Sequence, residues 1–419
     1  MEDKEFEDMK NEVKISKNSI FSKENVNMGH QPEFDYLKTL FILIMLPNHV
    51  SEHYSKDCFT IIVDYVGFMI GAAGIMMMMG IGMRYSRHQE PSYYFSRGII
   101  LLTKGQFLNL LKQCLPNLIA WWATGQKIFI SRALLVLQTD IQIFSGFCFI
   151  IFSIVKKMKL SVNFILIFSF IMNVAALPIH KIMKPPESFL LRQILGYFVL
   201  TDTETYFPLC SYFFFVAFGY WFGGIYQKIS NKDKFYNLIF ILFLPITFFY
   251  CYLRIQNYFP MLPEFGSDEH YCLSSGFDGI ATLMYNFVYL AVFHRIDVLL
   301  KGKTPHCIVK FGKNLNQYYM LHYIIIMQSN TFLRATKGDN FPSKMKYPSL
   351  FAFAILVLCM ILIDMNEKYI HFTITKLKNP MRNIIFTLIW ITTIICVIYI
   401  YPKAEFYSTF WNNYWYETN

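Results

Sequence analysis

The feature that most constrains this chain is its regular alternation of long apolar stretches with short basic loops. From Asp35 onward, each apolar stretch approaches the roughly 20 residues that a helix needs to cross about 30 Å of hydrocarbon. Only 16% of the residues are charged and 55% are apolar, against roughly 25% charged in soluble domains, which excludes a soluble enzyme. We therefore predict an all-α fold, a polytopic integral membrane helical bundle of about 10–11 transmembrane helices.

The predicted membrane domain leaves a polar segment at each end of the chain. Residues 1–34 lack the apolar core of a signal peptide, and we expect a cytoplasmic, mostly disordered tail. The membrane domain occupies 35–402, and residues 403–419 form a short extracytoplasmic tail. A stretch at 188–200 is too short to span. We expect spans near 36–52, 58–82, 98–121, 133–155, 161–179, 207–227, 235–254, 277–299, 314–333, 347–366 and 383–401.

The net charge of +10 lies in the loops rather than on one helix face, so it indicates membrane orientation and not nucleic-acid binding. Loops such as the one with Lys156, Lys157 and Lys159 alternate with leaner loops. This places the amino terminus in the cytoplasm and the carboxyl terminus outside. The loop with Lys344 and Lys346 is the exception. The nine cysteines occur without a CxxC pair, so we expect no metal site and no disulfide scaffold.

Ionisable side chains within predicted spans are functional candidates, because burying them in a bilayer costs roughly 2.5–3.5 kcal/mol or more. The first span, DYLKTLFILIMLPNHV, carries Lys38 at its inner end and His49 eleven residues later. Eleven residues is close to three helical turns, so both side chains fall on nearly one face. His49 is a candidate general base or acyl acceptor, since imidazole titrates near neutrality. The alternative is an interfacial His that reaches water beside the helix-kinking Pro47.

Two carboxylates come to about the same depth as His49. Asp64 lies in the outer part of the second span and Asp140 in the outer part of the fourth. Either one can orient the imidazole and fix its tautomer. The alternative is that they pair with Lys104 or Lys112 in a structural network.

Further polar residues lie at the ends of other spans. Arg84 and Arg87 are three apart, so they project to one side if the helix continues, ready to bind the phosphates of acyl-CoA or of lipids. The alternative is ordinary positive-inside flanking charge. The segment FGKNLNQYYMLHYIII must face protein or water, and we expect it to line an inner vestibule with His322 structural or pore-lining. Asp202, Glu204 and Tyr206 either contact a hydroxylated acceptor or form a solvated loop.

Four landmarks in order carry a resemblance to a known family. They are the first-span basic residue with a His eleven residues on, the RxxR pair, the FPL-to-GYWFGG span, and the late FGKNL…YYMLH segment. Together they resemble the acyltransferase family 3 superfamily and are similar to its heparan-α-glucosaminide acetyltransferase-like relatives, from about Phe34 to Asn366. The resemblance implies a catalytic role for His49 and donor binding by Arg84 and Arg87. That family typically has Arg where Lys38 stands, and a point charge does not replace a bidentate fork.

The resemblance implies an acyltransferase of a bacterial plasma membrane that uses cytoplasmic acyl-CoA, with acetyl-CoA as the expected donor. The acceptor is a hydroxyl or amine of a glycan or lipid-linked envelope molecule, and the chain is a monomer or an oligomer. His49 either deprotonates the acceptor or is acylated first, with Asn48 or Gln138 as candidates to stabilise the oxyanion. The main alternative is a transporter or flippase of a lipid-linked sugar, although no internal repeat supports it. A membrane sensor or scaffold without catalysis is the third.

Overall fold

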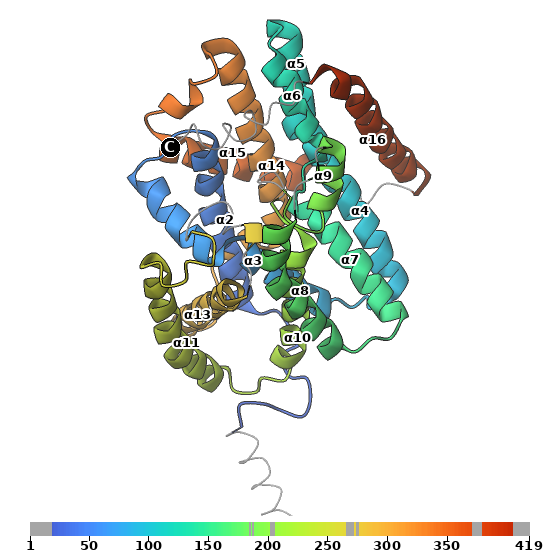
Figure 1. Cartoon of the computed structure of the whole chain (residues 1–419). Coiled ribbons are helices and arrows are strands. Elements are labelled where there is room, and N and C mark those ends of the chain that lie inside the picture. Colours follow the sequence, from blue (N-terminus) through green and yellow to red (C-terminus); the bar gives the residue numbers. More distant parts are fainter. Residues whose placement is uncertain are drawn as a thin grey trace, which may run out of the picture.

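The computed structural model describes residues 19–183, 186, 188–201, 206–264, 272–273, 276–370 and 379–404. Over these residues the regular elements are helices, and an isolated antiparallel β-bridge joins Phe21 to Ile229. The prediction of an all-α helical bundle is confirmed (Figure 1). The α-helices are α2 (Pro32–His53), α3 (Cys58–Tyr85), α4 (Pro91–Asn109), α5 (Leu115–Thr124), α6 (Lys127–Ala133), α7 (Ile141–Lys157), α8 (Val162–Ile182), α9 (Phe189–Gly196), α10 (Leu209–Tyr226), α11 (Lys232–Ile255), α13 (Phe277–Leu299), α14 (His306–Lys337), α15 (Pro348–Met365) and α16 (Asn379–Ile400).

The shorter helical elements join or extend these helices. The π-helical turn η1 (Leu110–Cys114) connects α4 to α5 without a break, and the 3-10 turn η2 (Leu134–Leu137) follows α6. A second π-helical turn, η4 (Asn366–Ile370), extends α15, and 3-10 turns stand at η3 (Pro342–Lys344) and η6 (Tyr401–Lys403).

Several helices are long and apolar enough to cross a membrane, so the chain is a multi-pass membrane protein. Five of the described helices qualify by length and composition, at Val162–Ile182, Leu209–Tyr226, Lys232–Ile255, Pro348–Ile370 and Pro380–Lys403. A sixth candidate is α3, whose halves Cys58–Gly67 and Gly71–Tyr85 meet at 47°. The other predicted spans also coincide with helices, which are shorter or carry more polar residues, and their crossing stays a prediction.

Helix α2 is central to the bundle. It packs against α3, α13, α14 and α15, while α3 packs along α10 and α4 along α7. The largest hydrophobic cluster contains Phe41 of α2 together with residues of α3, α7, α10 and α13. A second cluster joins Ile42 of α2 to α14 and α15. Because α2 belongs to both clusters, its side chains are held between α3 on one side and α14 on the other.

Helices α3 and α10 approach so closely that their backbones touch at two glycines. A Cβ atom on Gly80 would lie 2.1 Å from the carbonyl oxygen of Val216, and one on Gly219 would lie 2.0 Å from that of Met77. Small residues at such crossings are typical of helix packing in membranes. The contact fixes the C-terminal half of α3 against α10.

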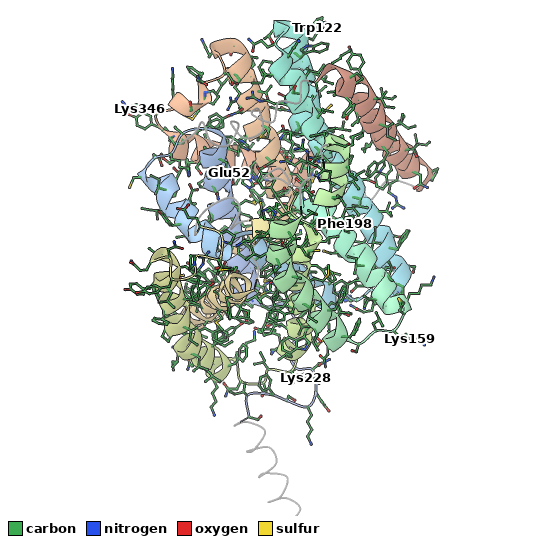
Figure 2. All side chains as sticks on the ribbon, viewed as in Figure 1. Glu52, Trp122, Lys159, Phe198, Lys228 and Lys346 are labelled. Atoms are coloured by element: carbon green, nitrogen blue, oxygen red, sulfur yellow. The ribbon has the colours of Figure 1, made fainter. Side chains whose placement is uncertain are left out.

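The predicted grouping of the basic loops is visible in the arrangement of the bundle ends. Figure 2 shows Lys159 and Lys228 at the end where the N-terminal segment lies, and Trp122 and Lys346 toward the opposite end. The N-terminal segment is tied to that end, because the Val26 amide donates to the Gln227 carbonyl oxygen at 2.7 Å. Lys346, from the loop that was the exception to the charge pattern, accordingly lies away from the other two lysines.

Candidate catalytic site

The crossing of α2 with α14 brings His49 and His322 together. His49 Nδ1 lies 2.9 Å from His322 Nε2, and the two rings stack with their centroids 5.1 Å apart. The His322 Nδ1 atom lies 2.6 Å from the Tyr318 carbonyl oxygen, one turn earlier in α14. His322 is fully buried and His49 is partly exposed. The sequence indicates a structural or pore-lining His322 and does not indicate its contact with His49.

These contacts assign the protons on both rings. A carbonyl oxygen can only accept, so His322 Nδ1 donates to Tyr318. The Nε2 atom of a neutral His322 then has a lone pair, and His49 Nδ1 must donate to it. His49 Nε2 is left unprotonated, which is the state that a general base or nucleophile requires.

His49 lines two cavities, and one of them is polar. Its wall includes Glu52, Lys112, Asp140 and Tyr319, and its empty volume is about 350 Å³ with its open side counted. The wall also includes Thr139, whose buried Oγ1 has no hydrogen-bond partner among the described residues. Such a group is ready to bond a polar ligand or a water.

A buried ion pair organises the polar cavity. Lys112 Nζ lies 3.1 Å from Asp140 Oδ2, and the two side chains are 3% and 0% exposed. The Tyr319 hydroxyl donates to the same oxygen at 2.6 Å, and Asp140 Oδ1 caps α7 by accepting from the Gln142 amide at 2.8 Å. Lys112 stands on the π-helical turn η1, a feature that is frequent at functional sites. Both carboxylate oxygens of Asp140 are therefore engaged by this network.

The second cavity beside His49 is mostly apolar. It lies between α2 and α3, and its empty volume is about 510 Å³ with its open side counted. Three polar residues, Asn48, His49 and Tyr319, contribute to its wall, and the rest are apolar or glycine. His49 therefore separates an apolar space from a polar one, and Tyr319 and Phe207 also border both.

The sequence predicted that Asp64 or Asp140 orients the imidazole, and the structure corrects both assignments. Asp64 accepts from Ser51 Oγ at 2.8 Å and pairs with Lys56 at 3.3 Å, and it lines neither cavity that contains His49. Asp140 shares the polar cavity with His49 but bonds Lys112, as the structural alternative expected. The Nδ1 position of His49, where a carboxylate would bind, is taken by His322.

The expectation that Arg84 and Arg87 project from one helix face is wrong. Helix α3 ends at Tyr85, and Ser86 is extended, so Arg87 lies beyond the helix and is exposed. Past the end of the helix, Gln89 Nε2 donates to the Met83 and Ser86 carbonyl oxygens at 3.1 and 2.7 Å, and the Tyr94 hydroxyl also donates to the Met83 oxygen at 2.9 Å.

A different cation lies near Arg84. The aliphatic part of Arg84 packs on Gly223 of α10 and its guanidinium on Gly224, and the guanidinium carbon stands 5.4 Å from the centre of the Tyr220 ring. Lys156 of α7 donates to the hydroxyl of the same tyrosine at 3.0 Å. Among the described residues, neither cation has a carboxylate within ion-pair distance. Neither of the two cavities beside His49 includes Arg84, Arg87 or Lys156.

The remaining predicted residues are placed as follows. Lys38 pairs with Asp35 at 3.2 Å, and Asp35 also meets His30 at 2.6 Å, so Lys38 belongs to the end of α2 far from His49. Tyr206 lines the polar cavity, whereas Asp202 and Glu204 lie outside the described residues. Asn48 lines the apolar cavity beside His49.

Comparisons with known proteins add no family assignment. No family model, no curated protein and no solved structure matches this chain. Within the described residues there is also no group of three or more His, Cys, Asp or Glu side chains that could hold a metal ion. The site is therefore interpreted from its own geometry.

Proposed function

We propose that the protein is a membrane acyltransferase that moves an acyl group from acyl-CoA to a hydroxyl or amine of a glycan or other envelope molecule. The observation that carries the proposal is His49: its Nε2 atom is left as a proton acceptor by the contact with His322, and its ring borders both an apolar and a polar cavity. The four sequence landmarks that resemble the acyltransferase family 3 superfamily support the same activity.

In the proposed reaction, the acceptor hydroxyl enters the polar cavity and gives its proton to His49 Nε2. The hydroxyl oxygen then attacks the thioester carbonyl carbon, and the tetrahedral intermediate carries the negative charge on the former carbonyl oxygen. Asn48 lines the apolar cavity beside His49, and its side-chain amide can donate to that oxygen. Collapse expels the CoA thiolate, which takes the proton from the His49 imidazolium, and leaves an ester on the acceptor.

The two cations at Tyr220 are the proposed docking site for the phosphates of the donor. Arg84 and Lys156 reach the same tyrosine from α3 and α7, and Arg84 supplies a planar fork that suits phosphate oxygens. Arg84 precedes Tyr85, whose hydroxyl donates to the Asn27 carbonyl oxygen of the N-terminal segment at 2.7 Å, and Lys156 stands three residues before Lys159. We assign this bundle end to the cytoplasm. In this arrangement Lys156 takes the place of Arg87 as the second cation.

The proposal is tested with purified protein in nanodiscs, using acyl-CoA and an envelope extract and following free CoA and acylated products by mass spectrometry. His49→Ala should lose roughly 10²–10⁴ in rate, with an unchanged melting temperature. His88→Ala is the matched control, because His88 is exposed in the loop after α3. Wild-type protein that never consumes the thioester but moves a lipid-linked sugar between leaflets would replace the proposal with the flippase alternative.

A further inference from the structure

The apolar cavity beside His49 has its polar atoms at one end. Asn48 and His49 close that end, while Phe41, Ile44 and Met45 continue the wall along α2. Phe41 lies eight residues before His49, so the wall runs about 12 Å along the helix axis. The lining of this cavity is therefore polar at His49 and apolar along the rest of α2.

The opposite wall is widened by missing side chains. Gly67 faces α2, and a Cβ atom there would come within 2.9 Å of Ile44 Cγ2. Helix α3 then breaks at Gly71, where φ is −37° and ψ is −123°, and the helix axis turns by 47°. Ala72, with its single methyl group, follows at once and also lines the cavity. The space is thus built into the course of α3 and does not come from one poorly packed side chain.

We propose that this cavity is the binding site for the acyl chain of the donor and that the chain is several carbons longer than acetyl. The inference rests on the proposed function, because it places the thioester at His49. An acetyl group ends one carbon beyond its carbonyl and would leave most of a 12 Å wall without contact. A longer alkyl chain covers that wall, whereas the polar cavity on the other side of His49 suits the hydroxylated acceptor.

The competing occupant is the amide-containing arm that links the thioester to the nucleotide of CoA. Two amide groups in that arm need hydrogen-bond partners. Among the described residues, the polar side chains of the wall are gathered beside the reacting end, so the side chains in the middle of the cavity offer an amide no hydrogen-bond partner. An alkyl chain has no such requirement. The lining therefore favours the acyl chain over the arm.

The test measures binding, so it needs no knowledge of the acceptor. Stable thioether analogues, S-ethyl-CoA, S-butyl-CoA, S-hexyl-CoA and S-octyl-CoA, are titrated into the full-length protein in nanodiscs beside CoA itself. Each methylene buried in the cavity should tighten binding by roughly three- to fourfold. S-hexyl-CoA should then bind at least 30-fold more tightly than S-ethyl-CoA.

Two substitutions fill the cavity from different positions, Ala72→Leu and Gly67→Val. Each should reduce the ratio of S-hexyl-CoA to S-ethyl-CoA affinity by at least tenfold, and melting curves check that each variant is folded. Equal affinity for all four analogues in the wild type would overturn the inference and leave the proposed function standing. Equal weakening of every analogue by both substitutions would also overturn it and assign the cavity to the arm. If CoA itself does not bind, the proposed function fails as well.

Discussion

At the scale of single residues, the contact between His49 and His322 yields the sharpest prediction. Replacing His322 by Ala removes the acceptor that holds the His49 proton on Nδ1, so both tautomers of His49 become populated. We expect kcat to fall by about 10²-fold with little change in KM for acyl-CoA. His322→Gln should restore part of the loss, because the amide oxygen can accept from His49 Nδ1.

Nitrogen-15 NMR of labelled histidine distinguishes this positioning role from a structural one, since only the former changes the tautomer of His49. Tyr318→Phe is the matched control: the oxygen that His322 bonds is the backbone carbonyl of Tyr318, which the substitution retains. Wild-type tautomer and rate in His322→Ala would contradict the assignment.

The Lys112–Asp140 pair gives a second prediction at this scale. Either Lys112→Met or Asp140→Asn alone leaves a buried charge without its partner, and we expect about 3–5 kcal/mol of destabilisation. The double substitution should cost less than the sum of the two, because no unpaired charge remains. Thermal unfolding of the four proteins in the same detergent measures this coupling, and additive losses would show that the pair is energetically independent.

The sequence predicted His49 but not its partner, and the reason is geometric. Position along each helix predicts which residues lie near His49: Asp140 lines a cavity with it, and Asp64 accepts from Ser51, two residues further along α2. Which side chain faces the imidazole depends on how α2 crosses α14. The two histidines that meet at this crossing are 273 residues apart in the sequence. No local pattern reports that crossing. The segment around His322 gives two signals, its polar character and its place in the YYMLH landmark, and neither indicates that His322 contacts His49.

At the scale of helices, the backbone contact between α3 and α10 predicts that substitutions of two nearby glycines differ strongly in their effect on stability. Gly80→Ala places a methyl group against the Val216 carbonyl and should destabilise the protein by about 1–3 kcal/mol. Gly82→Ala is the control: it lies two residues along the same helix, with no atom within 4 Å of its Cβ position. It should be neutral or stabilise by up to about 1 kcal/mol. Melting temperatures that fall equally in both variants would argue against the close approach.

The carboxyl group of Asp57, which caps the start of α3, should make the stability of the protein depend on pH. Burial alone would raise the pKa of Asp57, but hydrogen bonds from Ser349 and Thr60 outweigh it and lower the pKa to about 2. A carboxyl whose pKa is lowered on folding stabilises the protein above its ordinary pKa, and that contribution disappears as the pH falls from about 4 toward 2. Asp57→Ala should therefore lower the melting temperature at pH 6, and the difference from wild type should shrink by pH 3. A difference that stays constant over this range would contradict the capping role.

Apolar patterning located the helices well, because each predicted span coincides with one helix or with consecutive helices. The exact ends of the helices were harder to predict from the sequence. At the end of α3, Gln89 and the Tyr94 hydroxyl both donate to the Met83 carbonyl oxygen in the last turn. The helix also breaks at Gly71, although the other glycines of α3 remain helical. The apolar pattern of the sequence reports neither feature.

At the scale of the whole molecule, the proposal requires one donor to reach from one bundle end to His49. Arg84 lies 13 residues beyond the break at Gly71, about 20 Å along α3. The apolar cavity ends between these points, so binding of the donor phosphates and catalysis occupy separate regions joined by α3. Changes at the cationic end should alter donor affinity without changing chemistry at the imidazole.

Arg84→Gln therefore should raise KM for acyl-CoA about tenfold or more, with a much smaller effect on kcat, because hydrogen bonds to charged groups contribute roughly 1.5–3 kcal/mol. Lys156→Gln should act in the same direction, since Lys156 reaches the same tyrosine. Removing either cation should also weaken the dependence of KM on salt, because fewer charges meet the phosphates. Arg87→Gln is the control, as its side chain is exposed beyond the helix end. If Arg87→Gln raises KM as much as Arg84→Gln, the phosphates bind the loop after α3 and not the site formed by Arg84 and Lys156.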